Sequence, residues 1–373
     1  MQLQGVRIAL VGPLPPPAGG MANQTRQLAG LLREEGLQVT VVQVNAPYRP
    51  AWIGRIRGLR AVFRLLPYLV ALWQAAERVQ LMHVMANSGW SWHLFAAPAV
   101  WIAKLRGVAV VINYRGGEAG AFLARSYTWV RPTLQCANAL IVPSGFLQQE
   151  VFSRYDIQVG VVPNIIDLNR FTATRQPAPT LSPHIVVTRN LEPIYDIPTA
   201  LRAFQRLRTV FPEAHLTIAG SGPLQAELVR LTAKLGLTEA VTFTGRLDNE
   251  RIAALYHTAD LLLNPSLADN MPISILEALA CGVPVVSTQV GGIPFLLENG
   301  RTALLVPAGD DQLMAQAAIR LLKDQQLAQA LCTAGIAMVQ QYTWSRVRER
   351  LFTVYNDLLS AKDRTAPACF PDE

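Results

Sequence analysis

Cysteine is scarce in this sequence of 373 residues: the four cysteines are scattered along the chain, and no two of them form a C-x-x-C pair. This usage argues against a metal site or a disulfide framework and fits a reducing cytoplasm. Charged residues account for only 16% of the chain and hydrophobic residues for 51%, a composition too apolar for a disordered protein. The length is sufficient for two domains with separate cores.

Long hydrophobic runs are absent as well. The N-terminal run is about six residues long, so it is too short for a signal peptide and is typical of a buried strand. The longest uncharged stretch, 79–103, contains His83, Asn87, His93 and Pro98, which make it a poor membrane span. We therefore expect a cytoplasmic protein that lies free in the cytosol or on a membrane surface.

Acidic residues are rare in the first half of the chain, and none lies between Glu35 and Glu77. Residues 1–165 contain 15 basic and 6 acidic residues, a net charge of +9, whereas the remainder carries −2 of the total of +7. This asymmetry predicts that the first half meets something anionic.

Apolar, β-branched runs alternate with helical patterns through both halves, which predicts parallel sheets with helices on both faces. The predicted strands are 7–12, 38–44, 81–85, 108–114, 139–144, 184–190, 215–222, 241–245, 261–266 and 283–288. The predicted helices are 21–35, 196–210, 224–235, 249–258, 272–281 and 311–322, followed by a late amphipathic helix at 344–361.

A polar, proline-rich stretch near 165–182 separates the two halves and lacks periodicity. We therefore predict an α/β protein with two Rossmann-like domains. The first is 1–168, completed by the helix at about 344–361, and the second is 169–343. Residues 362–373 are expected to form a flexible tail.

The first strand is followed by a glycine-rich turn that opens a helix at Gly19 and Gly20. Glycine lets the backbone approach a ligand closely, and a helix N-terminus offers free N–H groups, so the turn is a candidate cradle for an anion or a sugar phosphate. It matches neither G-x-G-x-x-G nor a Walker loop, which disfavours a dinucleotide or ATP. An ordinary tight turn is the alternative.

The most informative segment is 264–307, which reads as strand, loop, helix, strand and loop. Pro272 helps to start the helix, and its first turn, Met271 to Ser274, offers free N–H groups to a phosphate. Glu277, further along that helix, could accept hydrogen bonds from the vicinal hydroxyls of a ribose. Two alternatives stay open: Asp269 could be an ordinary cap of the helix, and Glu277 a solvated helix residue.

This segment resembles the donor site of glycosyltransferase family 4. The family's hallmark is two acidic residues separated by seven others, followed by E-A-x-A-x-G-x-P-V-V and a G-G-I-P loop. Asp269 replaces the usual first glutamate, Glu277 is the second, and the loop stands at 291–294, although Phe295 replaces the glutamate that usually follows it. The resemblance extends over nearly the whole chain, through the segments 15–42, 161–171, 216–228 and 241–266.

The resemblance implies a GT-B fold, in which two parallel sheets face each other across a cleft, the first domain for the acceptor and the second for the nucleotide sugar. It implies a retaining, metal-independent transfer from a UDP-, GDP- or similarly activated sugar, with no other cofactor. Glu277 would bind the ribose, Asp269 would lie near the donor sugar, and the backbone at Arg246 or Leu247 would face the base. The other donor-binding residues expected are Gly19, Gly20, Tyr195, Gly220, Gly222, Asn270, Met271, Pro272 and Ile273.

Two departures from the family's pattern concern positive charge. The family usually places an arginine and a lysine on the diphosphate; Arg189 fills the first position, but Tyr195 stands at the second. The family often has a histidine facing the donor at the end of an N-domain strand, where this chain has Arg115. Arg115 could supply the absent charge near the phosphates or the acceptor, so we group it with Asp269 and Arg189 as the expected catalytic residues. Each position also has a structural alternative; Arg189, for instance, could cap a surface loop.

The segment 48–79 interleaves arginines with apolar residues. A basic amphipathic segment with a tryptophan at its edge is typical of a helix that lies on anionic lipid. Pro67 is expected to kink or end this helix. A core helix with a solvated arginine face is the alternative, while a nucleic-acid patch would lack any recognition module. The residues expected at the membrane surface are Arg49, Trp52, Arg55, Arg57, Arg60, Phe63 and Arg64.

Three hypotheses follow for the function. In the first, the protein is a glycosyltransferase, peripheral on the inner membrane, that adds a sugar to a lipid-linked or polysaccharide-precursor acceptor. In the second, the same transfer reaches a soluble acceptor. In the third, motivated by Tyr195 and Arg115, a catalytically silent GT-B protein binds a sugar nucleotide or a partner glycosyltransferase. No nucleic-acid partner is expected.

Overall fold

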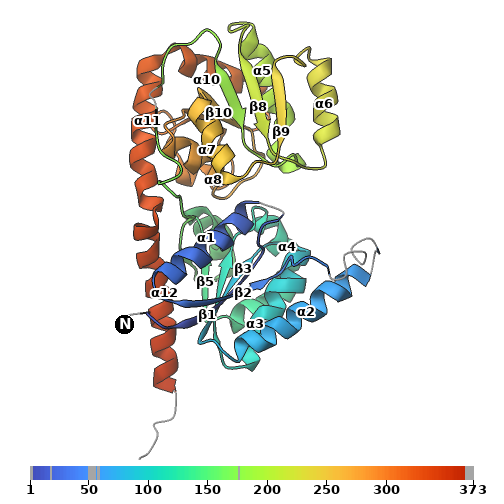
Figure 1. Cartoon of the computed structure of the whole chain (residues 1–373), viewed down its shortest axis with the longest axis vertical. Coiled ribbons are helices and arrows are strands. Elements are labelled where there is room, and N and C mark those ends of the chain that lie inside the picture. Colours follow the sequence, from blue (N-terminus) through green and yellow to red (C-terminus); the bar gives the residue numbers. More distant parts are fainter. Residues whose placement is uncertain (1–2, 17–18, 49–55, 57–58, 175–176, 366–373) are drawn as a thin grey trace, which may run out of the picture. The chain divides into compact units, whose positions relative to one another are not determined.

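The computed structural model describes residues 3–16, 19–48, 56, 59–174 and 177–365. Its contacts divide the chain into two compact units, Met1–Pro163 with Val347–Glu373, and Asn164–Arg346. Each unit contains a six-stranded sheet whose neighbouring strands are all parallel (Figure 1). The predicted α/β class with parallel sheets is confirmed.

The first unit has the strand order β2-β1-β3-β4-β5-β6. In chain order its elements are β1 (Arg7–Gly12), α1 (Gly20–Glu34), β2 (Gln38–Gln43), α2 (Leu59–Ala76), β3 (Leu81–Ala86), α3 (Ala97–Leu105), β4 (Ala109–Tyr114), α4 (Ala119–Cys136), β5 (Ala139–Val142) and β6 (Gly160–Val161). The last helix of the chain, α12 (Trp344–Thr365), belongs to this unit from Val347 onward.

The two faces of this sheet bury different residues, because side chains alternate across a strand. In β4, Ile112 and Tyr114 join a core shared with α2, α3 and α4. The right-handed connection from β1 to β2 places α1 on the opposite face. On that face the buried His83 of β3 contacts the hydroxyl of Tyr355 in α12, over 2.7 Å. This unit therefore has helices on both faces, as the sequence predicts.

The second unit has the strand order β12-β11-β10-β7-β8-β9. Its elements are β7 (His184–Val187), α5 (Ile197–Arg208), β8 (His215–Ala219), α6 (Gln225–Lys234), β9 (Val241–Gly245), α7 (Asn249–Thr258), β10 (Leu261–Asn264), α8 (Ile273–Ala280), β11 (Val285–Thr288), α9 (Ile293–Leu296), β12 (Leu304–Val306), α10 (Asp311–Lys323) and α11 (Gln325–Val339). One face of the sheet packs Val187 against α5, α6 and α10, and the other packs Val186 against α7 and α8.

Several details differ from the sequence-based expectations, and the helices α3, α4, α9 and α11 lie outside the predicted set. The strands β6 and β12 lie outside the predicted set, since two and three residues are too few to show a period. Pro67 lies inside α2, so the helix does not end there, and the alternative of a kink stays a prediction. Helix α12 continues to Thr365, because no glycine or proline interrupts it after Trp344. Within the described residues, no helix combines the length and apolarity that a membrane crossing needs.

Candidate active site

The strand order of the second unit reverses at one place. The chain moves outward from β7 to β8 and β9, and then returns to the other side of β7 at β10. Open parallel sheets bind their ligands beyond the carboxyl ends of the strands at such a reversal. The residues that follow β7 and those that end β10, beginning with Arg189 and Asn264, therefore define the candidate site.

Arg189 is held from two sides. Its guanidinium forms an ion pair with Asp269, and its Nε donates a hydrogen bond to Oδ1 of Asn264 over 2.8 Å. Asn264 donates in turn to Oγ of Ser287 over 2.9 Å. The exposed fractions of the Arg189 and Asp269 side chains are only 11% and 12%. The pair is thus shielded from water, which strengthens its electrostatic attraction.

Asp269 acts in this pair and not as a helix cap. The N-cap of α8 is Pro272, and Oδ1 of Asp269 accepts a hydrogen bond from the amide of Asn270 over 2.9 Å. The alternative of an ordinary cap is therefore wrong. Tyr195 lies beside the same pair, with its ring centroid 5.0 Å from Cζ of Arg189. Tyr195 thus offers the arginine an aromatic face at the position where the family has a second cation.

The loop after β11 rests on the backbone of Asp269 and Asn270. A Cβ added at Gly291 would lie 2.2 Å from the Asp269 carbonyl oxygen, and one at Gly292 would lie 1.9 Å from that of Asn270. The amide of Gly292 donates to the Asp269 carbonyl over 2.9 Å. Only glycine allows this approach, so the G-G-I-P loop fixes the segment that carries Asp269.

Gly220 and Gly222 allow a similar close contact with the loop that carries Arg189. A Cβ at Gly220 would lie 1.9 Å from the Arg189 carbonyl oxygen, and one at Gly222 would lie 2.3 Å from that of Leu191. The Leu191 amide donates to the Ser221 carbonyl over 3.2 Å. These glycines therefore position the loop of Arg189.

The start of α8 is anchored from the beginning of this unit. Nδ2 of Asn164 donates to the carbonyl oxygen of Met271 over 2.8 Å, in a buried position. Met271 is 7% exposed, and Pro272 is buried beside it, while Ile273 opens the helix and is partly exposed. The amides of a first helical turn have no partner within the helix, so this anchored turn is suited to meet an anion.

Glu277, in α8, is partly buried. Burial raises its pKa from 4.5 to about 7, an effect that the Tyr256 hydroxyl, Arg189 and Arg170 partly offset. Burial also raises the pKa of Tyr256 well above its usual range, and its hydroxyl donates to the Ser274 carbonyl over 3.0 Å. Glu277 is therefore not a freely solvated helix residue, and it lies within electrostatic reach of the Arg189–Asp269 pair.

Polar residues that the sequence analysis did not single out complete the site. Asn264 ends β10, and Oγ of Ser266 donates to its Oδ1 over 3.2 Å. The hydroxyl of Thr288 donates to the Ser266 carbonyl over 2.6 Å. All three are buried. The signal that could have found them is a polar residue directly after a buried apolar run, as in LLLNPS at 261–266.

Arg246 and Leu247 follow the edge strand β9, where Gly245 has a φ of 69°. The amide of Gly220 donates to the Gly245 carbonyl over 2.9 Å, so the ends of β8 and β9 meet. Arg246 is exposed and Leu247 is partly exposed. Both lie at the carboxyl edge of the sheet, the edge that carries Arg189.

The remaining predicted site residues, Gly19, Gly20 and Arg115, belong to the first unit. Gly19 is the N-cap of α1, and Gly20 is its first residue. No atom outside their own neighbours would lie within 4 Å of a Cβ added at either glycine, so this turn borders open space. Arg115 follows β4 at the carboxyl edge of the first sheet, and its amide donates to the Ala86 carbonyl over 2.9 Å.

The predicted membrane-surface residues are only partly described. Phe63 in α2 is 47% exposed. Arg64 is partly exposed, and its guanidinium stacks on the Tyr48 ring, 4.3 Å from the centroid. Arg60 lies in α2, but its side chain is outside the described residues. Arg49, Trp52, Arg55 and Arg57 lie outside the described residues altogether.

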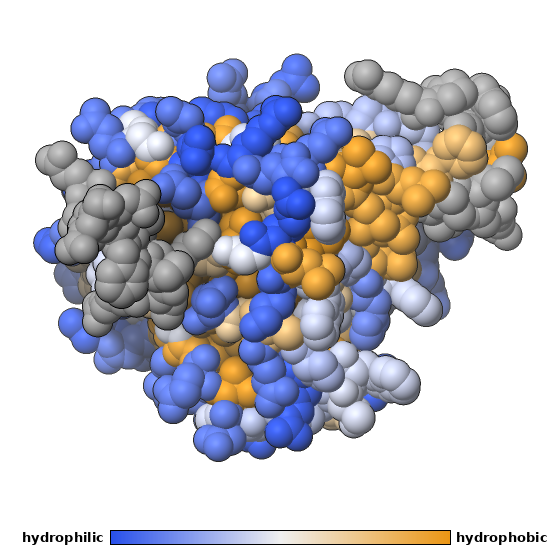
Figure 2. Space-filling view, turned by 90° about the horizontal axis from the view of Figure 1, so that it is seen from below, coloured by the Kyte–Doolittle hydropathy of each residue, from blue (hydrophilic) through white to orange (hydrophobic). Residues whose placement is uncertain are grey.

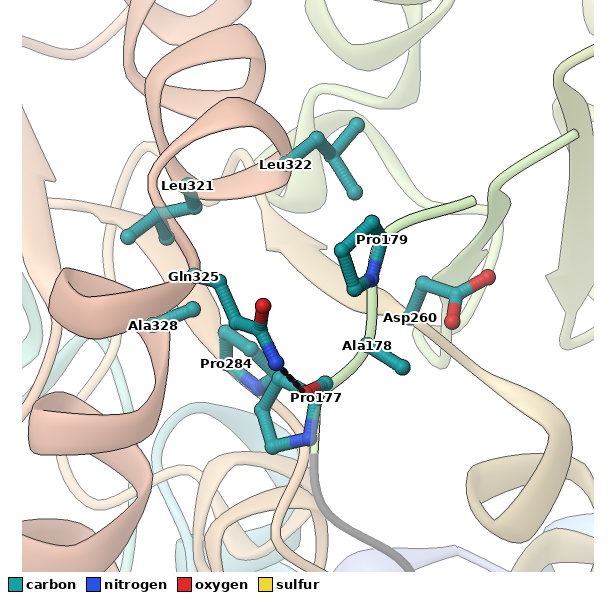
Figure 3. Close-up of a pocket in the computed structure, with 9 residues that line it drawn as sticks. All are labelled: Pro177, Ala178, Pro179, Asp260, Pro284, Leu321, Leu322, Gln325 and Ala328. Atoms are coloured by element: carbon teal, nitrogen blue, oxygen red, sulfur yellow. Dashed lines mark hydrogen bonds between the residues drawn. The ribbon is translucent and has the colours of Figure 1, made fainter. Parts of the chain in front are cut away.

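A small pocket of the second unit lies under the proline-rich segment at 177–179 (Figure 3). Nε2 of Gln325 donates to the Pro177 carbonyl over 3.3 Å across it. Asp260 and Pro284 line it, and these residues come directly before β10 and β11. The pocket therefore lies at the amino ends of the strands, opposite the edge with Arg189 and Asp269, and is no candidate for the active site.

Known proteins resemble this chain along both units. Residues 18–170 match the family model described as Glycosyltransferase Family 4, and residues 182–324 match that of Glycosyl transferases group 1. N-acetyl-alpha-D-glucosaminyl L-malate synthase of Bacillus anthracis is 33% identical over 177 residues, which are 47% of this chain and only 45% of that protein. Phosphatidyl-myo-inositol mannosyltransferase of Mycobacterium leprae is 25% identical over 370 residues, which cover 94% of this chain and 96% of that protein.

The fold also has solved counterparts. The crystal structure of Anabaena Alr3699/HepE in complex with UDP and glucose matches with a TM-score of 0.71 and 18% identity, over 95% of this chain and all of that one (100%). Identity at this level supports the fold alone, and the fold is the expected GT-B type, with two Rossmann-like units. The two family models match the two units in turn, and the acidic pair and glycine loops of their hallmark lie together in the second unit. The chain therefore belongs to the family 4, or group 1, glycosyltransferases.

Proposed function

We propose that this protein transfers a glycosyl group, with retention, from a nucleotide sugar to a lipid-linked or polysaccharide-precursor acceptor at the cytoplasmic face of the membrane. The observation that carries the proposal is the shielded Arg189–Asp269 pair beside the start of α8 and the partly buried Glu277. This arrangement provides a cation and helix amides for a diphosphate, and a carboxylate for the ribose. Leaving-group charge would develop where these groups can stabilise it.

The donor is proposed to be a UDP-sugar, with a GDP-sugar as the alternative. The Anabaena neighbour holds UDP and glucose, which supports the uridine nucleotide. Arg246 and Leu247 would face the base, and Asn270 to Ile273 would contact the sugar and phosphate. Metal independence is part of the proposal, since Arg189 and the amides of α8 would carry the charge of the diphosphate. Activity that survives an excess of EDTA would support it.

The membrane-bound acceptor is supported by an apolar stripe on α2. Phe63, Leu66, Val70 and Trp73 are 47%, 58%, 55% and 43% exposed. Their spacing of three and four residues places them on one side of the helix. Figure 2 shows apolar side chains gathered in a band on a face of the molecule, bordered by hydrophilic residues. Exposed apolar bands of this kind mark interaction surfaces.

The named relatives support different acceptors. The Mycobacterium leprae relative is, by its name, a mannosyltransferase for phosphatidyl-myo-inositol, which is a lipid. The Bacillus anthracis relative is a synthase of an L-malate glycoside, which favours the alternative of a soluble acceptor. The apolar stripe supports the lipid acceptor, because a soluble acceptor gives no reason for four exposed apolar side chains on one side of α2.

The test is a thermal-shift panel of UDP- and GDP-sugars on the full chain, followed by a measurement of donor consumption. We expect one nucleotide series to raise the melting temperature, because a ligand bound only to the folded state stabilises it. Glu277→Gln should reduce the shift and Arg189→Met should lose it, while the exposed control Glu239→Gln should keep it. Binding without turnover of any donor would favour the catalytically silent alternative, and no shift with any nucleotide would sink the donor site itself.

A further inference from the structure

Arg115, in the loop after β4, is partly exposed, but one nitrogen of its guanidinium is buried without a partner. Atom Nη2 of Arg115 is buried and has no hydrogen-bond partner. In the described part of the chain, no carboxylate lies within ion-pair distance of this guanidinium. A buried charge left unpaired is costly, and proteins generally retain one where a ligand pairs with it. The unpartnered Nη2 therefore indicates a site that an anion could occupy.

Arg115 projects to a defined side of the sheet. Its amide continues the β3–β4 ladder by donating to the Ala86 carbonyl, so the alternation of side chains extends to this residue. Tyr114 faces the core with α2, α3 and α4, and Arg115 therefore faces the other side, with His83. Burial and the charge of Arg115 together lower the pKa of His83 to about 3, so this histidine is neutral and leaves the arginine charge uncompensated.

The loop is built to hold this position. A Cβ added at Gly116 would lie 2.2 Å from Oγ of Ser88 and 3.0 Å from Oδ1 of Asn87, so a larger residue there would displace these side chains. The Ser88 hydroxyl shares a hydrogen bond of 2.8 Å with the Tyr114 hydroxyl, which ties the loop after β3 to the end of β4. The backbone that carries the guanidinium is thus fixed at the carboxyl ends of two neighbouring strands. Parallel sheets bind their ligands at this edge.

Backbone donors follow Arg115 directly in the chain. Gly116 and Gly117 lead into α4, an 18-residue helix whose N-cap, Glu118, makes no side-chain capping bond. A Cβ at Gly117 would have no atom within 4 Å, so the loop is open there. The free amides of such a helix start and a planar guanidinium are complementary to a phosphate or a carboxylate.

We propose that Arg115, with the loop of Gly116 and Gly117, is a subsite for an oxyanion, a phosphate or a carboxylate, carried by the acceptor. The inference rests on the proposed function, because it names the chemistry of the substrate that receives the sugar. It separates Arg115 from the diphosphate of the donor, which the proposed function assigns to Arg189 and the start of α8 in the second unit. Arg115 is then a substrate-binding residue that selects anionic acceptors over neutral ones.

The test follows the Arg115 Nε–H and Gly117 amide resonances of the full chain by NMR, during a titration with inorganic phosphate. The Nε–H resonance is assigned by its loss in Arg115→Met. With the protein saturated by UDP, we expect both resonances to shift saturably with phosphate. At the Gly117 amide, Arg115→Met should weaken the affinity about tenfold or more, because a charge-assisted bond is lost. Arg125→Met, which removes an exposed arginine of α4, is the matched control and should bind normally.

Further arms identify the source of the anion. Acetate in place of phosphate asks whether a carboxylate suffices, and saturable binding of either anion supports the subsite. Displacement of phosphate by UDP alone would overturn the proposal, because Arg115 would then belong to the donor's diphosphate. Displacement by UDP-glucuronate and not by UDP-glucose would overturn the assignment to the acceptor, since the oxyanion would belong to the donor sugar. Shifts that never saturate, or equal weakening by Arg125→Met, would also overturn it. If UDP fails to bind, the titration without UDP still reads the subsite, so failure of the donor proposal remains distinct.

Discussion

The Arg189 guanidinium forms an ion pair with the Asp269 carboxylate, 80 residues further along the chain, inside the second unit. One partner follows β7 and the other follows β10, so the pair bridges the two strands at which the sheet order reverses. Both side chains are nearly buried. Removal of one partner therefore leaves the other as an unpaired charge in a poorly solvated place.

The first prediction concerns this pair. Arg189→Met and Asp269→Asn should each lower the free energy of unfolding of the second unit, with Arg189→Met costing about 3 kcal/mol. In the double variant the loss of unfolding free energy should be smaller than the sum of the two single losses by about 1–3 kcal/mol, because both partners of the ion pair are removed together. Urea unfolding of the four proteins measures the coupling. Strictly additive losses would show that the pair contributes nothing to folding.

Independently of stability, Arg189→Met should slow glycosyl transfer about 100-fold or more if the arginine stabilises the leaving group.

The second prediction concerns the pH dependence of stability through Glu277. Its pKa is about 7 in the folded protein and ordinarily 4.5, so the folded state binds the proton more tightly than the unfolded chain does. The free energy of unfolding should therefore fall as pH rises from about 4.5 to about 7. At about 1.4 kcal/mol per pKa unit, the whole loss is about 3 kcal/mol. Glu277→Gln should lack this loss and should become the more stable protein above pH 7.

The carboxyl group of Glu277 should also make nucleotide binding depend on pH. Both oxygens of ionised Glu277 can accept hydrogen bonds from the ribose hydroxyls. The protonated carboxyl group accepts fewer of them, because one of its oxygens carries a proton. We expect the affinity of the wild-type chain for UDP to rise between pH 6 and pH 8 relative to that of Glu277→Gln. Calorimetry on both proteins removes the titration of UDP itself from the comparison. Parallel pH profiles would show that Glu277 does not contact the ribose.

The architecture was accessible from the sequence because buried strands of a parallel sheet carry a simple signal. The run VAVVINY at 108–114 is apolar on both sides, and β4 is buried along its whole length. The edge strands β6 and β12 escape this reasoning because they are too short to show a pattern. Local sequence likewise cannot reveal that Pro67 is accommodated inside α2, where the surrounding helix packs against the sheet.

The site was accessible in part. The glycines and acidic residues of the segment 264–307 could be recognised because their spacing matches the motif of the family. The partners of Arg189 are a different matter, because Asn264 and Asp269 meet it only through the order of strands in the sheet. The unpaired state of Arg115 is also invisible in a sequence, since it depends on which acidic side chains the fold keeps away.

The third prediction uses the glycines that support the site. Gly292→Ala should displace the segment of Asp269, because its Cβ would lie 1.9 Å from the Asn270 carbonyl oxygen. We expect a loss of about 1–3 kcal/mol in the free energy of unfolding and a loss of UDP binding. Gly30→Ala is the matched control, since its Cβ lies in open space within α1. That change should stabilise the first unit by about 0.5–1 kcal/mol and leave UDP binding intact.

A normal UDP affinity in Gly292→Ala would contradict the role of this loop. The melting temperature and the affinity are measured on the same samples, so a variant that merely fails to fold is recognised at once. A second variant, Gly220→Ala, tests the contact of Gly220 with the Arg189 carbonyl oxygen. It should likewise lose unfolding free energy and UDP binding.

The fourth prediction concerns the exposed stripe of α2. Leu66→Gln combined with Val70→Gln should weaken binding of the full chain to vesicles that contain anionic lipid by about tenfold, because two apolar side chains no longer enter the interface. Both positions are exposed, so the free energy of unfolding should change by less than about 0.5 kcal/mol per substitution. Co-sedimentation at several salt concentrations measures the affinity. Val229→Gln with Leu313→Gln removes two exposed apolar side chains from the second unit and is the matched control.

The lipid and salt dependence of this binding separates two causes. The net charge of the first 165 residues is +9. Binding should therefore be stronger on anionic than on neutral vesicles and weaker at high salt. The apolar stripe adds a contribution that salt does not screen, so the defect of the Leu66 and Val70 variant should persist at high salt. If this variant binds as the wild type does while transfer to a soluble acceptor proceeds, the stripe is not a membrane contact. The acceptor then approaches the first unit from water, and the subsite at Arg115 would select it by charge alone.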